Sequence, residues 1–124
     1  MPSILIVDDY AAIRAAVRAR FATCSGFVIC GEAVDGLDAI EKAATLKPDL
    51  ILLDMSMPRM NGVEAASVLK GLLPNVRIIA FTMYAEGLGK SLAAALNIDA
   101  VLAKPEGIEQ VVDCIRRLLP CPSC

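Results

Sequence analysis

Residues 50–54 read Leu-Ile-Leu-Leu-Asp, an apolar run that ends in a carboxylate. Three more runs end in polar groups: Ile-Leu-Ile-Val-Asp-Asp at 4–9, Val-Arg-Ile-Ile-Ala-Phe-Thr at 76–82 and Ala-Val-Leu-Ala-Lys-Pro at 100–105. Apolar strands of this kind are typical of a parallel sheet covered by helices on both faces. The carboxyl ends of parallel strands meet at one edge, where open α/β sheets bind ligands. The four runs therefore predict a parallel sheet with a polar site at that edge.

Helical patterns alternate with strand patterns along the whole chain. The strands are expected at 3–8, 27–30, 49–53, 76–81 and 100–103, and the helices at 10–23, 37–46, 62–72, 85–96 and 108–119. The last helix has the clearest pattern, because its apolar residues recur at i, i+3, i+4 and i+7. The inner face of the second helix is expected to be Ile40, Ala43 and Ala44. Since crossovers between parallel strands are right-handed, five such units predict an α/β sheet with helices on both faces.

Length and composition indicate one compact domain. The chain has 124 residues, of which 56% are hydrophobic and 21% are charged. Its net charge of −2 and its lack of a basic run exclude a nucleic-acid footprint of its own. No apolar stretch approaches the roughly 18 residues of a membrane span, and no signal-peptide pattern precedes the first strand. We therefore expect a cytoplasmic location and no membrane partner.

The positions of the cysteines indicate that they pack in the fold and do not act as redox or metal-binding residues. Cys24, Cys30 and Cys114 lie in or next to predicted elements and are expected to be reduced and half-buried. Cys121 and Cys124 have the spacing of a redox pair, but such a pair normally opens a helix after a strand, whereas this one follows the last helix. The chain has no histidine, which excludes a mixed Cys/His zinc site.

Three carboxylates are expected to meet at the edge of the sheet: those of Asp8, Asp9 and Asp54. Like charges at this spacing repel each other, and a divalent cation relieves the repulsion. Mg²⁺ prefers oxygen ligands and typically takes one or two carboxylates together with phosphate oxygens. Because Asp54 stands alone at the end of a buried strand, it is positioned as a nucleophile that could form an aspartyl phosphate.

Two more polar groups fit phosphoryl chemistry. The Lys104 ammonium would neutralise charge on the phosphoryl oxygens, and the Thr82 hydroxyl would donate a hydrogen bond to one of them. Simpler roles exist for each residue taken alone. Asp54 could be a turn residue, Thr82 a helix N-cap and Lys104 an ordinary exposed lysine. Their coincidence at one edge of the sheet favours the functional interpretation.

The motifs in combination resemble the receiver domain of a bacterial two-component response regulator. They are Ile-Leu-Ile-Val-Asp-Asp at 4–9, Gly-Glu-Ala-Val-Asp-Gly at 31–36, Pro-Asp-Leu-Ile-Leu-Leu-Asp-Met-Ser-Met-Pro at 48–58, Asn-Gly at 61–62, Phe-Thr at 81–82 and Lys-Pro at 104–105. The resemblance to this CheY-like family covers residues 3–119. The Gly-Glu-Ala-Val-Asp-Gly stretch at 31–36 is most similar to receivers of LuxR/NarL-type regulators. The resemblance implies a flavodoxin-like (βα)5 three-layer sandwich with sheet order 2-1-3-4-5. It also divides the chain into a receiver domain at 1–120 and a tail at 121–124.

The resemblance also implies roles for individual residues. Asp54 would be the phosphoacceptor for a sensor histidine kinase or a phosphotransfer protein. The ligands of Mg²⁺ would be Asp8, Asp9, Asp54 and the backbone carbonyl of Ser56. Thr82 would be the switch hydroxyl, and Lys104 would pair with the phosphate and precede a cis peptide bond to Pro105.

The resemblance implies a signalling domain and not an enzyme. Phosphorylation would switch the face built from residues 85–96, 100–103 and 108–119, changing partner binding or homodimer formation. DNA would be contacted only through an output domain outside this chain.

Two positions depart from the family pattern. Val101 stands where the family usually has Tyr or Phe, and Met83 stands where a small residue usually follows the switch threonine; Tyr84 is a candidate replacement for the missing ring. These departures keep open a phosphorylation-independent interaction module. Two other classes with a similar sheet are disfavoured. A haloacid-dehalogenase-type phosphatase needs a second aspartate as general acid where Ser56 stands. A flavodoxin binds the phosphate of its flavin in the loop after the first strand, where the acidic stretch at 8–10 would repel that phosphate.

Overall fold

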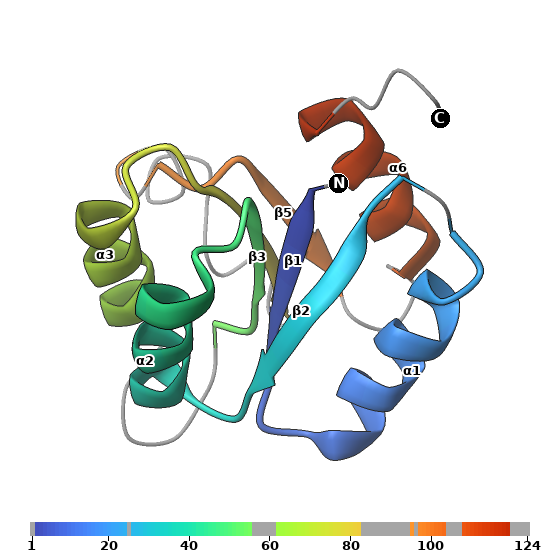
Figure 1. Ribbon diagram of the computed structural model, residues 1–124, viewed down its shortest axis with the longest axis horizontal. Coiled ribbons are helices and arrows are strands. Elements are labelled where there is room, and N and C mark those ends of the chain that lie inside the picture. Colours follow the sequence, from blue (N-terminus) through green and yellow to red (C-terminus); the bar gives the residue numbers. More distant parts are fainter. Residues whose placement is uncertain are drawn as a thin grey trace.

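A computed structural model describes residues 2–24, 26–55, 62–82, 95, 97–103 and 108–119. These residues form a five-stranded parallel sheet with helices on both faces (Figure 1). The strands are β1 (Ser3–Val7), β2 (Val28–Ala33), β3 (Leu50–Leu53), β4 (Arg77–Thr82) and β5 (Ala100–Ala103). The helices are α1 (Ala11–Phe21), α2 (Gly36–Leu46), α3 (Gly62–Leu72) and α6 (Ile108–Leu118).

The strand order is β2-β1-β3-β4-β5, and each described pairing is parallel. This confirms the order predicted from the sequence. From β1 to β4 a helix separates each strand from the next, and α1 and α6 cover one face of the sheet while α2 and α3 cover the other (Figure 1). The carboxyl ends of the strands point toward the bottom of Figure 1.

The core of the described residues consists of two clusters, one on each face of the sheet. Alternate residues of β1 divide between them: Ile4 and Ile6 face α1 and α6, whereas Leu5 and Val7 face α2 and α3. All four residues of β3 are buried, which explains why that strand reads as an unbroken apolar run. The cluster under α1 and α6 combines residues from both ends of the chain.

Two expectations about these elements were wrong in part. β2 is longer than residues 27–30, because the chain continues as a strand through Gly31 to Ala33. A glycine fits there since a Cβ at Gly31 would lie 2.9 Å from Cδ1 of Leu46 on α2. On α2 the buried alanines are Ala39 and Ala43, with Ile40 partly buried, whereas Ala44 is exposed. The face that α2 turns to the core therefore includes Ala39 and not Ala44.

Several predictions lie outside the described residues: the helix at 85–96, the cis bond at 104–105 and the Cys121–Cys124 pair. Cys24, Cys30 and Cys114 are free thiols, as expected. Cys24 and Cys30 are half-buried as predicted, but the prediction was wrong for Cys114, which is buried because α6 turns it into the core. No helix within the described ranges is long and apolar enough to cross a membrane.

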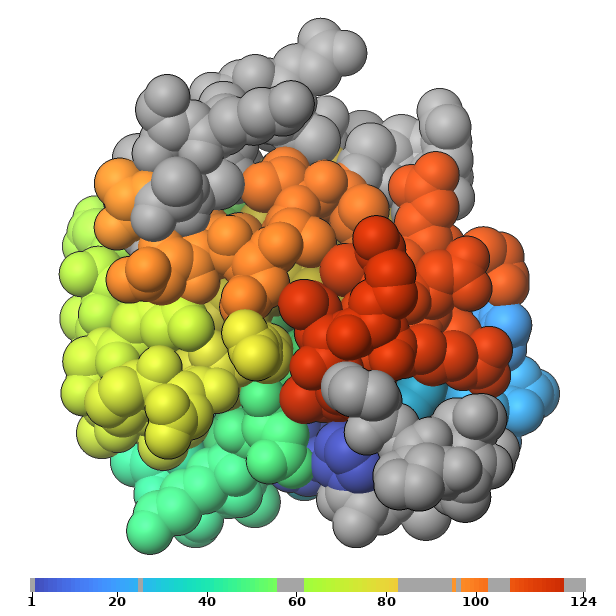
Figure 2. All heavy atoms as spheres, turned by 90° about the horizontal axis from the view of Figure 1, so that it is seen from above, coloured from blue at the N-terminus to red at the C-terminus, as the bar shows by residue number. Residues whose placement is uncertain are grey.

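Figure 2 shows the end of the molecule opposite the carboxyl edge, where orange β5 lies beside the yellow segment that leads into β4 and beside red α6.

Candidate functional site

The sheet register brings Asp8 and Asp54 side by side. Val7 of β1 pairs with Leu53 of β3, so the next residue of each strand is an aspartate at the same level. The Asp54 amide donates to the Val7 carbonyl over 2.9 Å, and the Asp8 amide donates to the Ala33 carbonyl over 3.0 Å. The backbone of both aspartates is thus fixed by ladder hydrogen bonds that continue past the strand ends.

Asp9 completes an acidic cluster with these two residues. One carboxylate oxygen from each of Asp8, Asp9 and Asp54 lies within 4.8 Å of the others. Asp8 is 2% exposed and Asp54 is 3% exposed, whereas Asp9 lies open to solvent. The cluster therefore has two buried carboxylates and one that is exposed to solvent.

The loop after β1 is held at two points of Asp8. Oδ1 of the Asp8 side chain accepts a hydrogen bond of 2.9 Å from the Tyr10 amide. Its backbone carbonyl accepts a bond of 2.7 Å from Nη1 of Arg14, which lies on the first turn of α1. Because this second bond has a charged donor, it is of the stronger class of protein hydrogen bonds.

Glu32 of β2 anchors that arginine. Its Oε1 accepts from Nε of Arg14 at 3.1 Å, and its Oε2 accepts from Nε of Arg18 at 2.6 Å. The Glu32 carbonyl also accepts a bond from the Lys42 ammonium on α2. Sequence reasoning missed this group, although Arg14 and Arg18 stand one helical turn apart on the side of α1 away from its apolar stripe.

The segment that follows Asp54 packs closely against the start of α3. The Gly62 amide donates to the Met55 carbonyl over 3.2 Å. A Cβ at Gly62 would lie 2.4 Å from the Met55 Cα and 2.8 Å from the Asp54 carbonyl oxygen. Only glycine therefore fits here without moving the backbone next to Asp54.

The other predicted site residues divide into described and undescribed positions. Thr82 ends β4, the strand next to β3, and is 1% exposed. Val101 of β5 pairs with Ala80 and packs partly buried against the cluster under α2 and α3. Ser56, Met83, Tyr84 and Lys104 lie outside the described residues.

The donor set of the acidic cluster suits a hard divalent cation. All three donors are carboxylate oxygens, the ligand type that Mg²⁺ and Ca²⁺ prefer over nitrogen or sulfur. Mg²⁺ typically takes one or two carboxylates and completes its coordination with water and phosphate oxygens. The residues present therefore fit Mg²⁺ together with a phosphorylated ligand.

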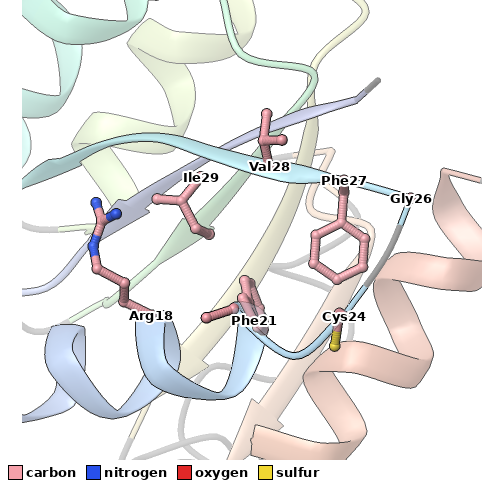
Figure 3. Close-up of a pocket in the computed structure, with 8 residues that line it drawn as sticks. Arg18, Phe21, Cys24, Gly26, Phe27, Val28 and Ile29 are labelled. Carbon is pink, nitrogen blue, oxygen red and sulfur yellow. The ribbon is translucent and has the colours of Figure 1, made fainter.

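A separate groove of about 350 Å³ lies between the end of α1 and the start of β2 (Figure 3). It is lined by Arg18, Phe21, Ala22, Cys24, Gly26, Phe27, Val28 and Ile29. Phe21 and Phe27 meet edge to face beneath it, with ring centroids 5.2 Å apart. The groove shares no lining residue with the acidic cluster and lies at the opposite end of the strands, so it is not part of that site.

Comparison with known proteins identifies the class of this fold and site. The family model of the response regulator receiver domain matches residues 4–116. The chain therefore belongs to the response regulator receiver domain family, the signal-receiving domains of two-component systems.

Individual relatives agree with this assignment. The response regulator protein VraR of Staphylococcus saprophyticus is 37% identical over 114 residues, which cover 92% of this chain and 54% of that protein. VraR of Staphylococcus aureus is 33% identical over the same length and coverage. The chain thus spans about half the length of the curated relatives it matches.

Solved structures match the fold over nearly the whole chain. A DNA-binding response regulator of the LuxR family from Staphylococcus aureus superimposes with a TM-score of 0.86 at 25% identity, covering 95% of this chain and 98% of that one. TrrA of Thermotoga maritima, solved in complex with Mg²⁺ and BeF, gives a TM-score of 0.84 at 27% identity and covers 96% and 100%. Both are similar to this chain in sheet order and helix arrangement.

Proposed function

We propose that this chain is a cytoplasmic phosphoacceptor receiver that takes a phosphoryl group on Asp54 in the presence of Mg²⁺. The observation that carries the proposal is the cluster of Asp8, Asp9 and Asp54 oxygens within 4.8 Å at the carboxyl ends of β1 and β3. Membership in the receiver family supports it, as does the similarity to TrrA, which was solved with Mg²⁺ and BeF.

In the proposed reaction, a carboxylate oxygen of Asp54 attacks the phosphorus atom of a phosphorylated donor. A new P–O bond forms, the bond from phosphorus to the leaving group breaks, and the leaving group departs with its electron pair. The donor is the phosphohistidine of a sensor kinase or a phosphotransfer protein. Bound Mg²⁺ would supply positive charge that offsets the charge on the phosphoryl oxygens.

This chain's own residues have separate tasks in the proposal. Asp8 and Asp9, together with Asp54 and the Ser56 carbonyl, hold the cation. The Thr82 hydroxyl donates to a phosphoryl oxygen, and the Lys104 ammonium pairs with another. Since Asp54 is buried and backbone-anchored, the attacking oxygen is held in place before the donor arrives.

The proposed signal is a population shift of one surface. The phosphoryl group adds negative charge and acceptor oxygens, which draw Thr82 and Lys104 toward Asp54. In the sequence Thr82 precedes the segment 85–96, and Lys104 stands between strand β5 and helix α6. The face built from these three elements would change its binding of a partner or of a second copy of the chain. Contact with DNA would belong to an output domain outside residues 1–124.

The test is the intact mass of the protein after incubation with acetyl phosphate and Mg²⁺. Wild type should gain one phosphoryl group, while Asp54→Asn and an EDTA-treated wild type should not. On the phosphorylated sample, backbone amide shifts over residues 82–105 should change relative to the unmodified protein. If the protein gains a phosphoryl group but these amide shifts do not change, the proposed phosphorylation is supported and the proposed conformational switch is wrong.

A second function has a specific observation in its favour. Val101 replaces the usual aromatic residue and is half-buried against the core, where its short side chain has no ring to turn inward. A folded protein that binds Mg²⁺ but takes no phosphoryl group would favour a phosphorylation-independent interaction module.

A further inference from the structure

We propose that Arg14 is a positioning residue for the Mg²⁺ site, holding the loop that carries Asp8 and Asp9 through the Asp8 carbonyl, with Glu32 as its anchor. This inference rests on the proposed function. It concerns how the metal-binding loop is kept in shape, and it assigns a task to a residue outside the acidic cluster.

The geometry starts from the guanidinium of Arg14. Its Nη1 donates to the Asp8 carbonyl at 2.7 Å, and its Nε donates to Glu32 at 3.1 Å. One planar group thus connects α1, the β1–α1 loop and β2. The side chain is 16% exposed, so water competes little for these bonds.

Glu32 gives Arg14 a fixed orientation. Its two oxygens are divided between Arg14 and Arg18, and its backbone carbonyl accepts from Lys42 on the neighbouring helix. The Glu32 carboxylate therefore has little freedom to rotate, and its bond to Arg14 limits the motion of the guanidinium in turn. Groups that hold metal-binding residues from behind commonly change metal affinity by about 10- to 100-fold when they are removed.

Arg14 acts on the site in two opposing ways. Its positive charge near the carboxylates disfavours a second cation, while its bond to the Asp8 carbonyl keeps the loop in the binding conformation. Glu32 offsets only part of that charge, because its one carboxylate is shared between Arg14 and Arg18. We expect the positioning effect to dominate, because the 2.7 Å bond acts directly on the backbone of Asp8, so loss of Arg14 should weaken Mg²⁺ binding.

Arg18 offers a matched control. It pairs with the same carboxylate at 2.6 Å, carries the same charge and lies one helical turn further along α1, but among the described residues its side chain bonds only to Glu32. Arg14→Gln and Arg18→Gln each remove one cation from Glu32. Arg14→Lys keeps the charge and removes the planar fork that reaches two partners at once.

The experiment measures the Mg²⁺ dissociation constant of the full chain by amide-shift titration, and the backbone order parameters of Asp9 and Tyr10 without metal. Arg14→Gln and Arg14→Lys should each raise the constant about tenfold. The two order parameters should fall from about 0.85 toward 0.6. Arg18→Gln should change the constant by less than about twofold, because an exposed ion pair contributes little.

Equal losses in the two glutamine variants, or tighter Mg²⁺ binding by Arg14→Gln, would overturn the inference. A wild-type protein that binds no Mg²⁺ would overturn the proposed function itself. In that case the metal-free order parameters still decide whether Arg14 orders the loop. Unchanged values in Arg14→Gln would show that it does not.

Discussion

At the scale of single residues, the acidic cluster trades stability for binding. Asp8, Asp9 and Asp54 present oxygens within 4.8 Å of one another, and two of these side chains are buried. Two unit charges at that distance repel by about 1 kcal/mol in water and by about 3 kcal/mol at the effective dielectric of a protein surface. Neutralising one of them should therefore stabilise the metal-free protein.

Asp9→Asn is the variant that tests this, because Asp9 is exposed and leaves no cavity. In EDTA its free energy of unfolding should exceed that of wild type by about 1 kcal/mol, measured by urea denaturation. Millimolar Mg²⁺ should raise the stability of wild type and raise that of the variant much less, since bound ligand stabilises the folded state.

Asp113→Asn serves as the control, because it removes the same charge from an exposed position of α6. Its effect in EDTA should stay within about 0.5 kcal/mol of wild type. A destabilised Asp9→Asn protein in EDTA would show that repulsion is not the dominant interaction of that carboxylate.

The site residues that could be predicted from the sequence are those at strand ends. Asp8, Asp9 and Asp54 each follow an apolar run, and parallel register alone brings such positions together. Arg14 and Glu32 could not be found this way, because their pairing depends on the lateral placement of α1 against β2. Periodicity gives the side of a helix on which a residue lies, but not the partner that it meets there.

At the scale of elements, the junction of β3 and α3 depends on one glycine. A Cβ at Gly62 would fall 2.4 Å from the Met55 Cα and 2.8 Å from the Asp54 carbonyl oxygen. Both of those atoms are backbone, so relief requires movement of the chain next to the proposed phosphoacceptor. Gly62→Ala should lower the free energy of unfolding by about 1–3 kcal/mol, the usual range for overpacking.

Gly71 of the same helix provides the matched control. No atom of the described residues would lie within 4 Å of a Cβ there, and the residue is exposed. Gly71→Ala should stabilise the protein by up to about 1 kcal/mol through helix propensity. Thermal unfolding of the two variants should therefore shift in opposite directions, and equal shifts would contradict the packing argument.

The extent of β2 illustrates where element prediction stops. Gly31 and Glu32 lack the apolar pattern of a strand, yet the chain remains extended through Ala33. The reason is tertiary: Leu46 packs over Gly31, and the ladder to β1 continues to Val7 and Ala33. Most of the described helix and strand bounds were predictable from apolar runs and helix-ending residues, and the sheet order followed from the family resemblance. The extension of β2 depends instead on a neighbour distant in sequence.

At the scale of the whole molecule, buried thiols make stability fall at alkaline pH. Burial raises the pKa of the Cys114 thiol, on the core-facing side of α6, and desolvation also raises the pKa of the half-buried Cys30 thiol. The folded protein therefore keeps these protons at a pH where the unfolded chain releases them. The stabilising contribution is complete below the ordinary pKa of 9.0 and is lost as the pH rises through the raised value.

Urea denaturation between pH 8 and pH 10 should show this as a falling free energy of unfolding in wild type. Cys114→Ala and the double variant with Cys30→Ala should have progressively shallower slopes, whatever their stability at pH 8. Other groups titrate in this range, so the difference between slopes is the quantity to compare. Identical slopes in all three proteins would exclude the thiols as the cause.

The cluster under α1 and α6 also constrains how the domain is made. Ile4 and Ile6 leave the ribosome before Val111 and Ile115, which help to cover the same face and follow about a hundred residues later. At ordinary rates of synthesis that interval is roughly 5 to 20 s. During that time one face of the nascent sheet is not yet covered by α6, and chaperones that bind exposed apolar strands can bind there. A stop codon before α6 would make that exposure permanent, so truncated chains should aggregate and not persist as smaller receivers.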